Sequence, residues 1–177
     1  MAEVGHNGMA PTLLSGERVL IYKRGKPEVG SIAVCRHPSE DGWVVGRVAA
    51  IGGETIDSFG NKLRIGGHPI VFEQQGTMSF HNTDNDLTST VVWGDEHFEA
   101  GPHQIFMAPD EGHRVRETEV PDGKVYLLGD HRAYLGQDSR AYGVVDASTC
   151  RGTIIFRLLA VEGLEPEIAH RNFQLIR

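Results

Sequence analysis

The sequence lacks both a long apolar run and a dense cluster of basic residues. No window of the 177 residues approaches the roughly 18–20 consecutive apolar residues that a membrane-spanning helix needs. The N-terminus has no charged region followed by an apolar stretch, so no export signal is visible. The net charge is −7 and the Lys and Arg residues are scattered, which argues against nucleic acid as a partner. We therefore expect a cytoplasmic protein without a membrane span.

Cysteine is also scarce, and no histidine pair has the spacing of a metal site. The two cysteines, Cys35 and Cys150, each adjoin an apolar segment, which favours buried thiols in a reducing compartment. A disulfide stays open as the alternative for an exported chain. Three of the nine histidines, His97, His103 and His113, fall in loop-like sequence, where we expect them to be solvated. We expect no metal and no cofactor.

Helical periodicity is nearly absent, and short segments rich in β-branched residues take its place. Bounded by Gly, Pro and Asp, they predict strands at residues 18–22, 31–35, 43–45, 47–51, 55–58, 62–65, 91–93, 104–107, 124–128, 143–145 and 152–159. Short helical turns are expected only at residues 9–14 and 146–150. The 22 glycines fit a strongly bent sheet with tight turns. The sequence therefore predicts an all-β, barrel-like fold.

Five sequence segments carry a resemblance to a known family, in order and at compatible spacings. They are residues 8–13, 29–34, 46–54, 60–70 and 120–132, the last continued by residues 137–145. Together they resemble the conserved boxes of bacterial type I signal peptidases, which are Ser/Lys peptidases. The resemblance implies a coiled antiparallel β-sheet or barrel formed by residues 1–72 and 119–177. It also implies an inserted β subdomain of variable type at residues 73–118.

The two side chains that define the family's chemistry are missing. In the family, a serine attacks the peptide carbonyl while a neutral lysine takes its proton. This chain has Gly8 and Gly46 at the matching positions. Glycine can neither attack a carbonyl nor accept a proton through a side chain. The family mechanism is therefore excluded at these positions.

The supporting positions of the resemblance differ as well. His6 stands where the family has a serine that assists the oxyanion. The run after Asp130 is one residue longer than usual, so Leu135 or Gly136 replaces the serine that positions the lysine. The resemblance implies that Asp138 and Arg140 form an ion pair beneath the site, beside a turn at Gly129 and Asp130. The cleft itself would be lined by His6, Gly8, Met9, Pro11, Gly46, Arg47 and Tyr134.

Three functions remain open for such a chain. The first is a pseudo-peptidase that binds an extended peptide or a protein partner in a cleft widened by the two glycines. The second is an enzyme with new chemistry in the same cleft, with His6 as a general base. The third is residual serine-type endopeptidase activity. An enclosed polar pocket with convergent ionisable groups would favour an enzyme, and an open apolar groove would favour binding.

Overall fold

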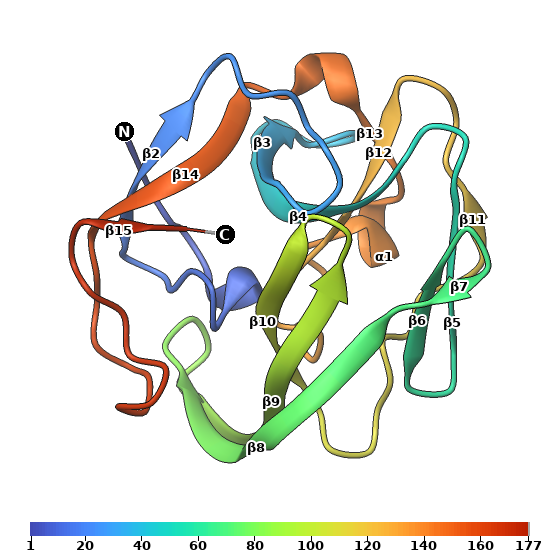
Figure 1. Ribbon diagram of the computed structural model, residues 1–177. Coiled ribbons are helices and arrows are strands. Elements are labelled where there is room, and N and C mark those ends of the chain that lie inside the picture. The colour runs from blue at the N-terminus through green and yellow to red at the C-terminus, as the bar shows by residue number, and fades with distance from the viewer. Residues whose placement is uncertain (177) are drawn as a thin grey trace.

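The computed structural model describes residues 1–176 and is built almost entirely of β-strands (Figure 1). The strands are β1 (Ala2–Glu3), β2 (Arg18–Tyr22), β3 (Ile32–Arg36), β4 (Trp43–Ile51), β5 (Thr55–Phe59), β6 (Lys62–Ile65), β7 (His68–Pro69), β8 (Val71–Asn82), β9 (Leu87–Phe98), β10 (Gly101–Met107), β11 (Thr118–Glu119), β12 (Lys124–Leu128), β13 (Val145–Asp146), β14 (Gly152–Leu159) and β15 (Gln174–Leu175). The helical elements are η1 (Asn7–Met9), α1 (Ser139–Tyr142) and η2 (Ala147–Thr149). The all-β prediction is confirmed.

The main sheet holds the segments that carry the resemblance. Its strand order is β1-β2-β14-β3-β4-β12-β13, with β15 paired to β14, and its neighbouring strands are antiparallel. Among the described residues the sheet does not close on itself, so the architecture is an open, coiled sheet rather than a barrel. Apolar residues of β3, β4, β12 and β13 form one core cluster with both cysteines. The β-branched segments form strands because they bury these side chains together.

Two smaller antiparallel sheets complete the fold. One has the order β11-β5-β6-β7, and the other has the order β10-β9-β8. The β8–β9 hairpin is much longer than the sequence indicated, with 12 residues in each strand. Residues 73–75 and 87–90 are all exposed and mostly polar, so the alternation of buried and exposed residues covers only part of each strand. The sheet of β8, β9 and β10 spans residues 71–107 and so makes up most of the expected insert at residues 73–118. The division of the chain into two domains stays a prediction.

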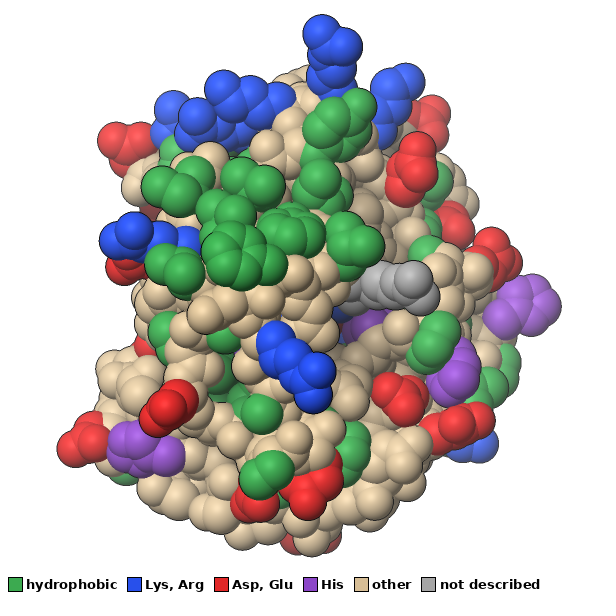
Figure 2. Space-filling model, turned by 60° about the vertical axis from the view of Figure 1, so that its left-hand side comes forward, with side chains coloured by type: hydrophobic (Ala, Val, Ile, Leu, Met, Phe, Trp, Pro, Cys, Tyr) green, Lys and Arg blue, Asp and Glu red, His purple; other side chains and the backbone are tan. Residues whose placement is uncertain are grey.

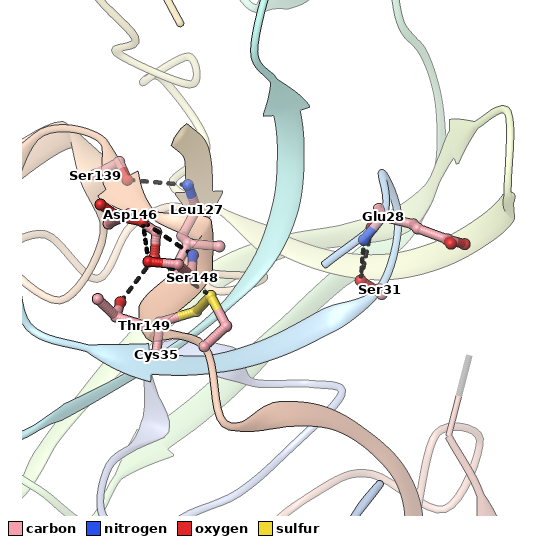
Figure 3. Close-up of a disulfide and its surroundings, with 9 residues drawn as sticks. Glu28, Ser31, Cys35, Leu127, Ser139, Asp146, Ser148 and Thr149 are labelled. Carbon is pink, nitrogen blue, oxygen red and sulfur yellow. Dashed lines mark hydrogen bonds between the residues drawn. A yellow bond between two sulfur atoms is a disulfide. The ribbon is translucent and has the colours of Figure 1, made fainter. Parts of the chain in front are cut away.

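The two cysteines form a disulfide, so the expectation of free buried thiols is wrong (Figure 3). Cys35 lies on β3 and is fully buried, and Cys150 follows η2. Asp146 caps η2 by accepting a hydrogen bond from the Ser148 N–H at 2.9 Å, and this turn brings Cys150 to β3. Disulfides are rare in a reducing cytoplasm. The bond therefore disagrees with the reducing compartment expected from the sequence, and the location stays a prediction.

One face of the main sheet is apolar. Figure 2 shows hydrophobic side chains gathered there, with Lys and Arg side chains along one edge. The exposed large apolar residues of β2, β14 and β15 are Leu20, Tyr22, Ile155, Leu159 and Leu175. Among the described residues, no helix is long and apolar enough to cross a membrane.

Candidate active site

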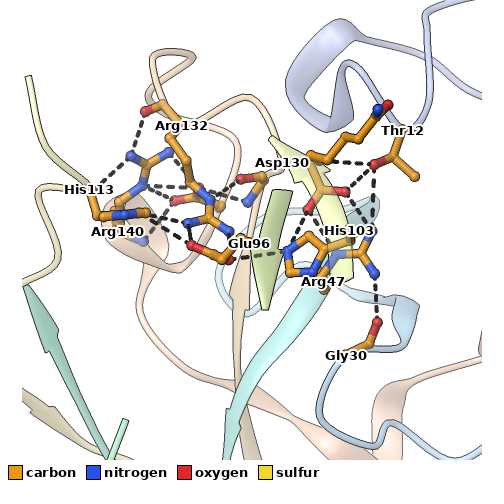
Figure 4. Close-up of polar contacts among 12 residues, drawn as sticks. Thr12, Gly30, Arg47, Glu96, His103, His113, Asp130, Arg132 and Arg140 are labelled. Carbon is orange, nitrogen blue, oxygen red and sulfur yellow. Dashed lines mark hydrogen bonds and ion pairs between the residues drawn. The ribbon is translucent and has the colours of Figure 1, made fainter. Parts of the chain in front are cut away.

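A buried ion pair joins β4 to the turn that follows β12. Arg47 donates to both carboxylate oxygens of Asp130, at 2.9 and 2.6 Å, and to the Gly30 carbonyl at 2.7 Å (Figure 4). The Thr12 hydroxyl donates to the same carboxylate at 2.5 Å. Burial alone would raise the pKa of Asp130, but the Arg47 guanidinium outweighs it and the pKa is lowered. Arg47 is 1% exposed, and it lies at the bottom of the hollow between residues 28–32 and 100–103.

The expected pair of Asp138 and Arg140 is also present. The Arg140 Nη2 lies 2.7 Å from the Asp138 Oδ2, and the same carboxylate oxygen accepts the Gly129 N–H at 3.0 Å. Asp138 also caps α1 by accepting the Arg140 N–H. A buried carboxylate needs this full set of donors to be tolerated. The turn at Gly129 and Asp130 is therefore held from both sides.

A third buried ion pair, missed in the sequence, connects this platform to the β8–β10 sheet. Arg132 donates to both oxygens of Glu96 on β9, at 2.8 and 2.6 Å. His103 Nε2 lies 3.1 Å from Glu96, and His113 accepts a hydrogen bond from Arg132. His103 is 5% exposed and His113 is 1% exposed, so the prediction that they are solvated is wrong. Their burial depends on long-range packing, which local sequence does not report.

Gly8 lies in η1, beneath the side chain of His6. The His6 Nδ1 accepts the Gly8 N–H at 3.0 Å, which caps the turn. A Cβ on Gly8 would lie 2.8 Å from that nitrogen and 3.4 Å from the Gln137 Cβ. The imidazole therefore stands where a nucleophile's side chain would begin. Burial lowers the pKa of His6, and its ring is stacked parallel to Tyr134 with centroids 6.3 Å apart.

Met9 and Pro11 belong to the core more than to a surface. Met9 is 1% exposed and packs with apolar residues of β2, β3 and β14. Pro11 is also buried, and the next residue, Thr12, is bonded to Asp130. The loop after Gly8 is held a second time by Arg157, which donates to the Thr12 carbonyl at 2.5 Å. These residues fix the loop, and the sequence contained no signal for the Arg157 contact.

Gly46 lies on β4 and has no free space on its side-chain face. A Cβ there would lie 2.8 Å from the Leu127 Cβ and 3.4 Å from the Leu128 carbonyl oxygen. Leu127 is fully buried and packs with Val44 and both cysteines. Cβ atoms essentially never approach this closely, so Leu127 fills the space of the missing side chain. The expectation that Gly46 widens a cleft is therefore wrong.

Half of β4 has a strand on one side only. Among the described residues, β12 pairs with β4 from Arg47 to Ile51, whereas β3 pairs with it from Trp43 to Arg47. The Val48 N–H and carbonyl both bond toward the β3 side. Backbone groups alternate along a strand, so those of Val45 point to the other side. In the described part of the chain, no strand pairs with β4 on that side at residues 43–46.

Two hollows of the structure lie away from Gly8 and Gly46. One, of about 470 Å³, lies between β10 and residues 167–176 and reaches Thr12 and Arg157. The other, of about 390 Å³, lies between residues 28–32 and 100–103. Neither is lined by Gly8 or Gly46. Neither hollow is therefore the enclosed pocket at Gly8 and Gly46 that would favour an enzyme.

Comparison with known proteins identifies the family. The family described as "Signal peptidase, peptidase S26" matches residues 1–159. This chain belongs to the S26 signal peptidase family. It is 29% identical over 153 residues to signal peptidase IB of Staphylococcus aureus, covering 84% of this chain and 72% of that protein. It is 24% identical over 152 residues to signal peptidase I of Bacillus licheniformis, covering 84% and 70%.

One solved structure is also similar to this chain. The crystal structure of a signal peptidase I from Enterococcus faecalis V583 matches with a TM-score of 0.44 and 19% sequence identity. The match covers 72% of this chain and 96% of that one. Family membership itself follows from the match over residues 1–159.

Proposed function

We propose that this S26 family member is not a peptidase but binds an extended peptide along the former substrate cleft. The observation that carries the proposal is the packing of Leu127 into the space at Gly46, 2.8 Å from where a Cβ would be. A lysine at that position would need the core to rearrange. With glycine at position 8 as well, the chain has neither the nucleophile nor the base at the family positions.

The nearby hydroxyl and imidazole groups already have structural contacts. The Ser139 Oγ is buried and accepts the Leu127 N–H at 2.9 Å. The His6 Nδ1 accepts the Gly8 N–H. These contacts support a structural role for each group over a new nucleophile and base pair.

The open edge of β4 supports binding by strand addition. An added strand gains affinity from backbone hydrogen bonds and specificity from alternate side-chain pockets. The Val45 N–H and carbonyl point to the open side, as derived from the β3 register. At the start of this edge, Trp43 is 44% exposed and the Arg36 guanidinium lies 4.3 Å from its ring centroid. An extended peptide would find both backbone partners and an aromatic surface here.

The decisive experiment combines a binding screen with a backbone variant. Unstructured peptides are screened for binding by calorimetry and for cleavage by mass spectrometry, and we expect binding without cleavage. Val45→Pro removes one N–H that faces the open edge and should weaken binding about fivefold, as expected for one lost hydrogen bond. Val45→Ile keeps the N–H and is the matched control. Equal affinity of both variants would contradict strand addition.

Cleavage by the unmodified protein would overturn the proposal and revive the other two functions. His6, Tyr134 and Asp84 lie near Gly8, and burial, followed by the charge of Asp84, raises the pKa of Tyr134. Cleavage that disappears in His6→Ala would identify His6 as the base of a repurposed enzyme. Cleavage that persists in His6→Ala would indicate a residual serine-type peptidase. The double variant Gly8→Ser/Gly46→Lys should stay inactive, because Leu127 occupies the space of the lysine.

A further inference from the structure

The tip of the β8–β9 hairpin lies directly on the loop that contains Gly8 (Figure 1). The Asn7 N–H donates to Asp84 at 2.6 Å, and the Asn7 side-chain amide donates to Asn82 at 2.9 Å and Thr83 at 3.0 Å. Burial and then the nearby charge of Asp84 raise the pKa of Tyr134, so the Asp84 carboxylate lies close to the Tyr134 side chain. Asn7 precedes Gly8, and Tyr134 stacks on the His6 ring above it. The tip therefore bridges both walls of the vacated site.

The base of the same sheet is docked through buried charges. Glu96 on β9 is fully buried and accepts two hydrogen bonds from Arg132 (Figure 4). Strand β10 adds two backbone bonds: the Phe106 N–H donates to the Asp130 carbonyl, and the Arg132 N–H donates to the Phe106 carbonyl. These contacts join the β8–β10 sheet to the turn after β12. The sheet is thus held at its base and at its tip.

His113 can make its contact in this interface only while its Nδ1 is unprotonated. The Arg132 Nη1 lies 2.7 Å from that nitrogen, and a guanidinium can only donate. Arg140 donates to the His113 carbonyl at 3.0 Å, while the Glu96 carboxylate lies 3.8 Å from the Nδ1. Burial, followed by the charge of Arg132, lowers the pKa of His113 to about 3 despite the attraction of Glu96. A proton on Nδ1 would place two cationic groups in contact.

His131 is a second neutral imidazole in the interface. It is 4% exposed, and neither ring nitrogen has a hydrogen-bond partner among the described residues. Its pKa is lowered to about 4, mainly by burial, with Arg140 lowering it further and Asp84 opposing. Three aromatic rings surround it, those of Phe80, Phe106 and Tyr134. Protonation would place an unsolvated charge between the sheet and the core.

His103 on β10 follows the same pattern. Burial and then the charge of Arg47 lower its pKa, although Glu96 and Asp130 favour its charged form. All three histidines lie where the β8–β10 sheet and the segment after it meet the core. In the docked state, burial disfavours the charged form of each ring.

We infer that the β8–β10 sheet is an acid-released cover over the vacated site at Gly8. Above pH 6.5 the three imidazoles are neutral and the hairpin tip stays on Asn7 and Tyr134. In acid, protonation favours the state in which the sheet has moved off the core and the rings reach water. That this opening admits a peptide rests on the proposed function, whereas the opening itself does not.

The direction of the pH effect follows from linkage. A released histidine has its ordinary pKa of 6.5, and the docked rings have lower pKa values. Docking is therefore strongest above pH 6.5, and each histidine weakens it by up to about tenfold per pH unit as the pH falls. For His113 and His131 together, the docking constant should fall roughly 10⁴-fold between pH 6.5 and pH 4.

The two tryptophans allow the cover and the core to be followed separately. Trp93 lies on β9 and packs against the cluster that contains Phe80 and Phe106, whereas Trp43 lies on β4. Trp43→Phe leaves Trp93 as the only reporter, and Trp93→Phe leaves Trp43. As the pH falls, the Trp93 fluorescence should change at a higher pH than that of Trp43. The protection factors of residues 82–86 against hydrogen exchange should fall over the same pH range.

Non-titrating variants decide whether the histidines cause the change. His113→Gln keeps an acceptor for Arg132, and His131→Phe fills the aromatic pocket, so each should move the Trp93 midpoint to lower pH. His68→Gln, at an exposed position, is the matched control and should leave the midpoint unchanged. Coincident Trp93 and Trp43 transitions, or midpoints unchanged in both variants, would overturn the cover.

Peptide binding is measured in the same buffers to keep the two proposals apart. Tighter peptide binding in acid, lost in His113→Gln and His131→Phe, supports both. Cover opening without any peptide binding overturns the proposed function and leaves the cover intact. Binding that is equal at both pH values, with no change at Trp93, overturns the cover and leaves the proposed function intact.

Discussion

The surroundings of Gly46 and Gly8 differ, although the family uses both positions for one reaction. Gly46 faces a dry cluster in which Leu127, Val44 and the disulfide cysteines pack together. Gly8 lies under the His6 ring, next to Asn7, which is bonded to the hairpin tip. The space at Gly46 is filled by the apolar core. Gly8 is instead covered by polar side chains.

The difference shows that two positions of one family site are filled in two different ways in this chain. Filling the space at Gly46 adds apolar packing, so any return of the base has to displace buried atoms. Covering Gly8 adds polar contacts at the surface of the core, which are individually weaker. The four predictions below test this contrast, from the largest expected effect to the smallest.

The largest effect should come from the disulfide beside Gly46. Cys35→Ala with Cys150→Ala removes a link between residues 115 positions apart, which constrains the unfolded chain. We expect the free energy of unfolding to fall by about 4 kcal/mol in urea denaturation. Dithiothreitol should destabilise the unmodified protein by a similar amount and leave the double variant unchanged. A fully reduced protein with an unaltered urea midpoint would refute this.

Overpacking at Gly46 should come next. Gly46→Ala places a Cβ 2.8 Å from the Leu127 Cβ and should cost about 1–3 kcal/mol of folding stability. Adding Leu127→Gly removes that Cβ and should remove most of the extra cost, so that the double variant resembles Leu127→Gly alone. Gly5→Ala is the control, because a Cβ there meets nothing within 4 Å. Additive losses at Gly46 and Leu127 would show that the two positions do not share this space.

The core strands could be predicted from the sequence, because their apolar residues are contiguous and β-branched. Arg18–Tyr22, Lys62–Ile65, Lys124–Leu128 and Gly152–Leu159 coincide with predicted segments. The long β8 and β9 strands could not, since exposed polar residues alternate with buried ones at Met78, Phe80 and Asn82. The pairing of the two cysteines depends on the register that sets Val34 opposite Gly152, which spans distant parts of the chain.

The candidate site was predictable only in part. The matched boxes located Asp130, Asp138 and Arg140, whose contacts are local or lie between boxes. They did not reveal that Leu127 fills the space at Gly46, because a filled space is a property of three-dimensional packing. His103 and His113 were also missed as buried groups, since their partners Glu96 and Arg132 are themselves joined by a pair that spans distant parts of the chain.

On the Gly8 side, the hairpin tip offers a smaller test. Asn7→Ala removes the two side-chain hydrogen bonds to Asn82 and Thr83 and leaves Asn82 buried without this donor. We expect a loss of about 1–2 kcal/mol and faster hydrogen exchange at residues 82–86. Ser89→Ala, at an exposed position on β9, should change neither quantity. Unchanged exchange in Asn7→Ala would mean that the tip is not held by this residue.

The smallest effect is expected for Gly8→Ser. The new Cβ would meet the end of the His6 ring at 2.8 and 2.9 Å, and a ring that can rotate yields at a cost below about 1 kcal/mol. Because burial lowers the pKa of His6, displacement of the ring into water should raise that pKa toward its ordinary value, which NMR titration measures. An unchanged His6 pKa would show that the ring stays in place. A serine tolerated at position 8, beside an alanine rejected at position 46, would mean that the base, and not the nucleophile, is the harder one to restore.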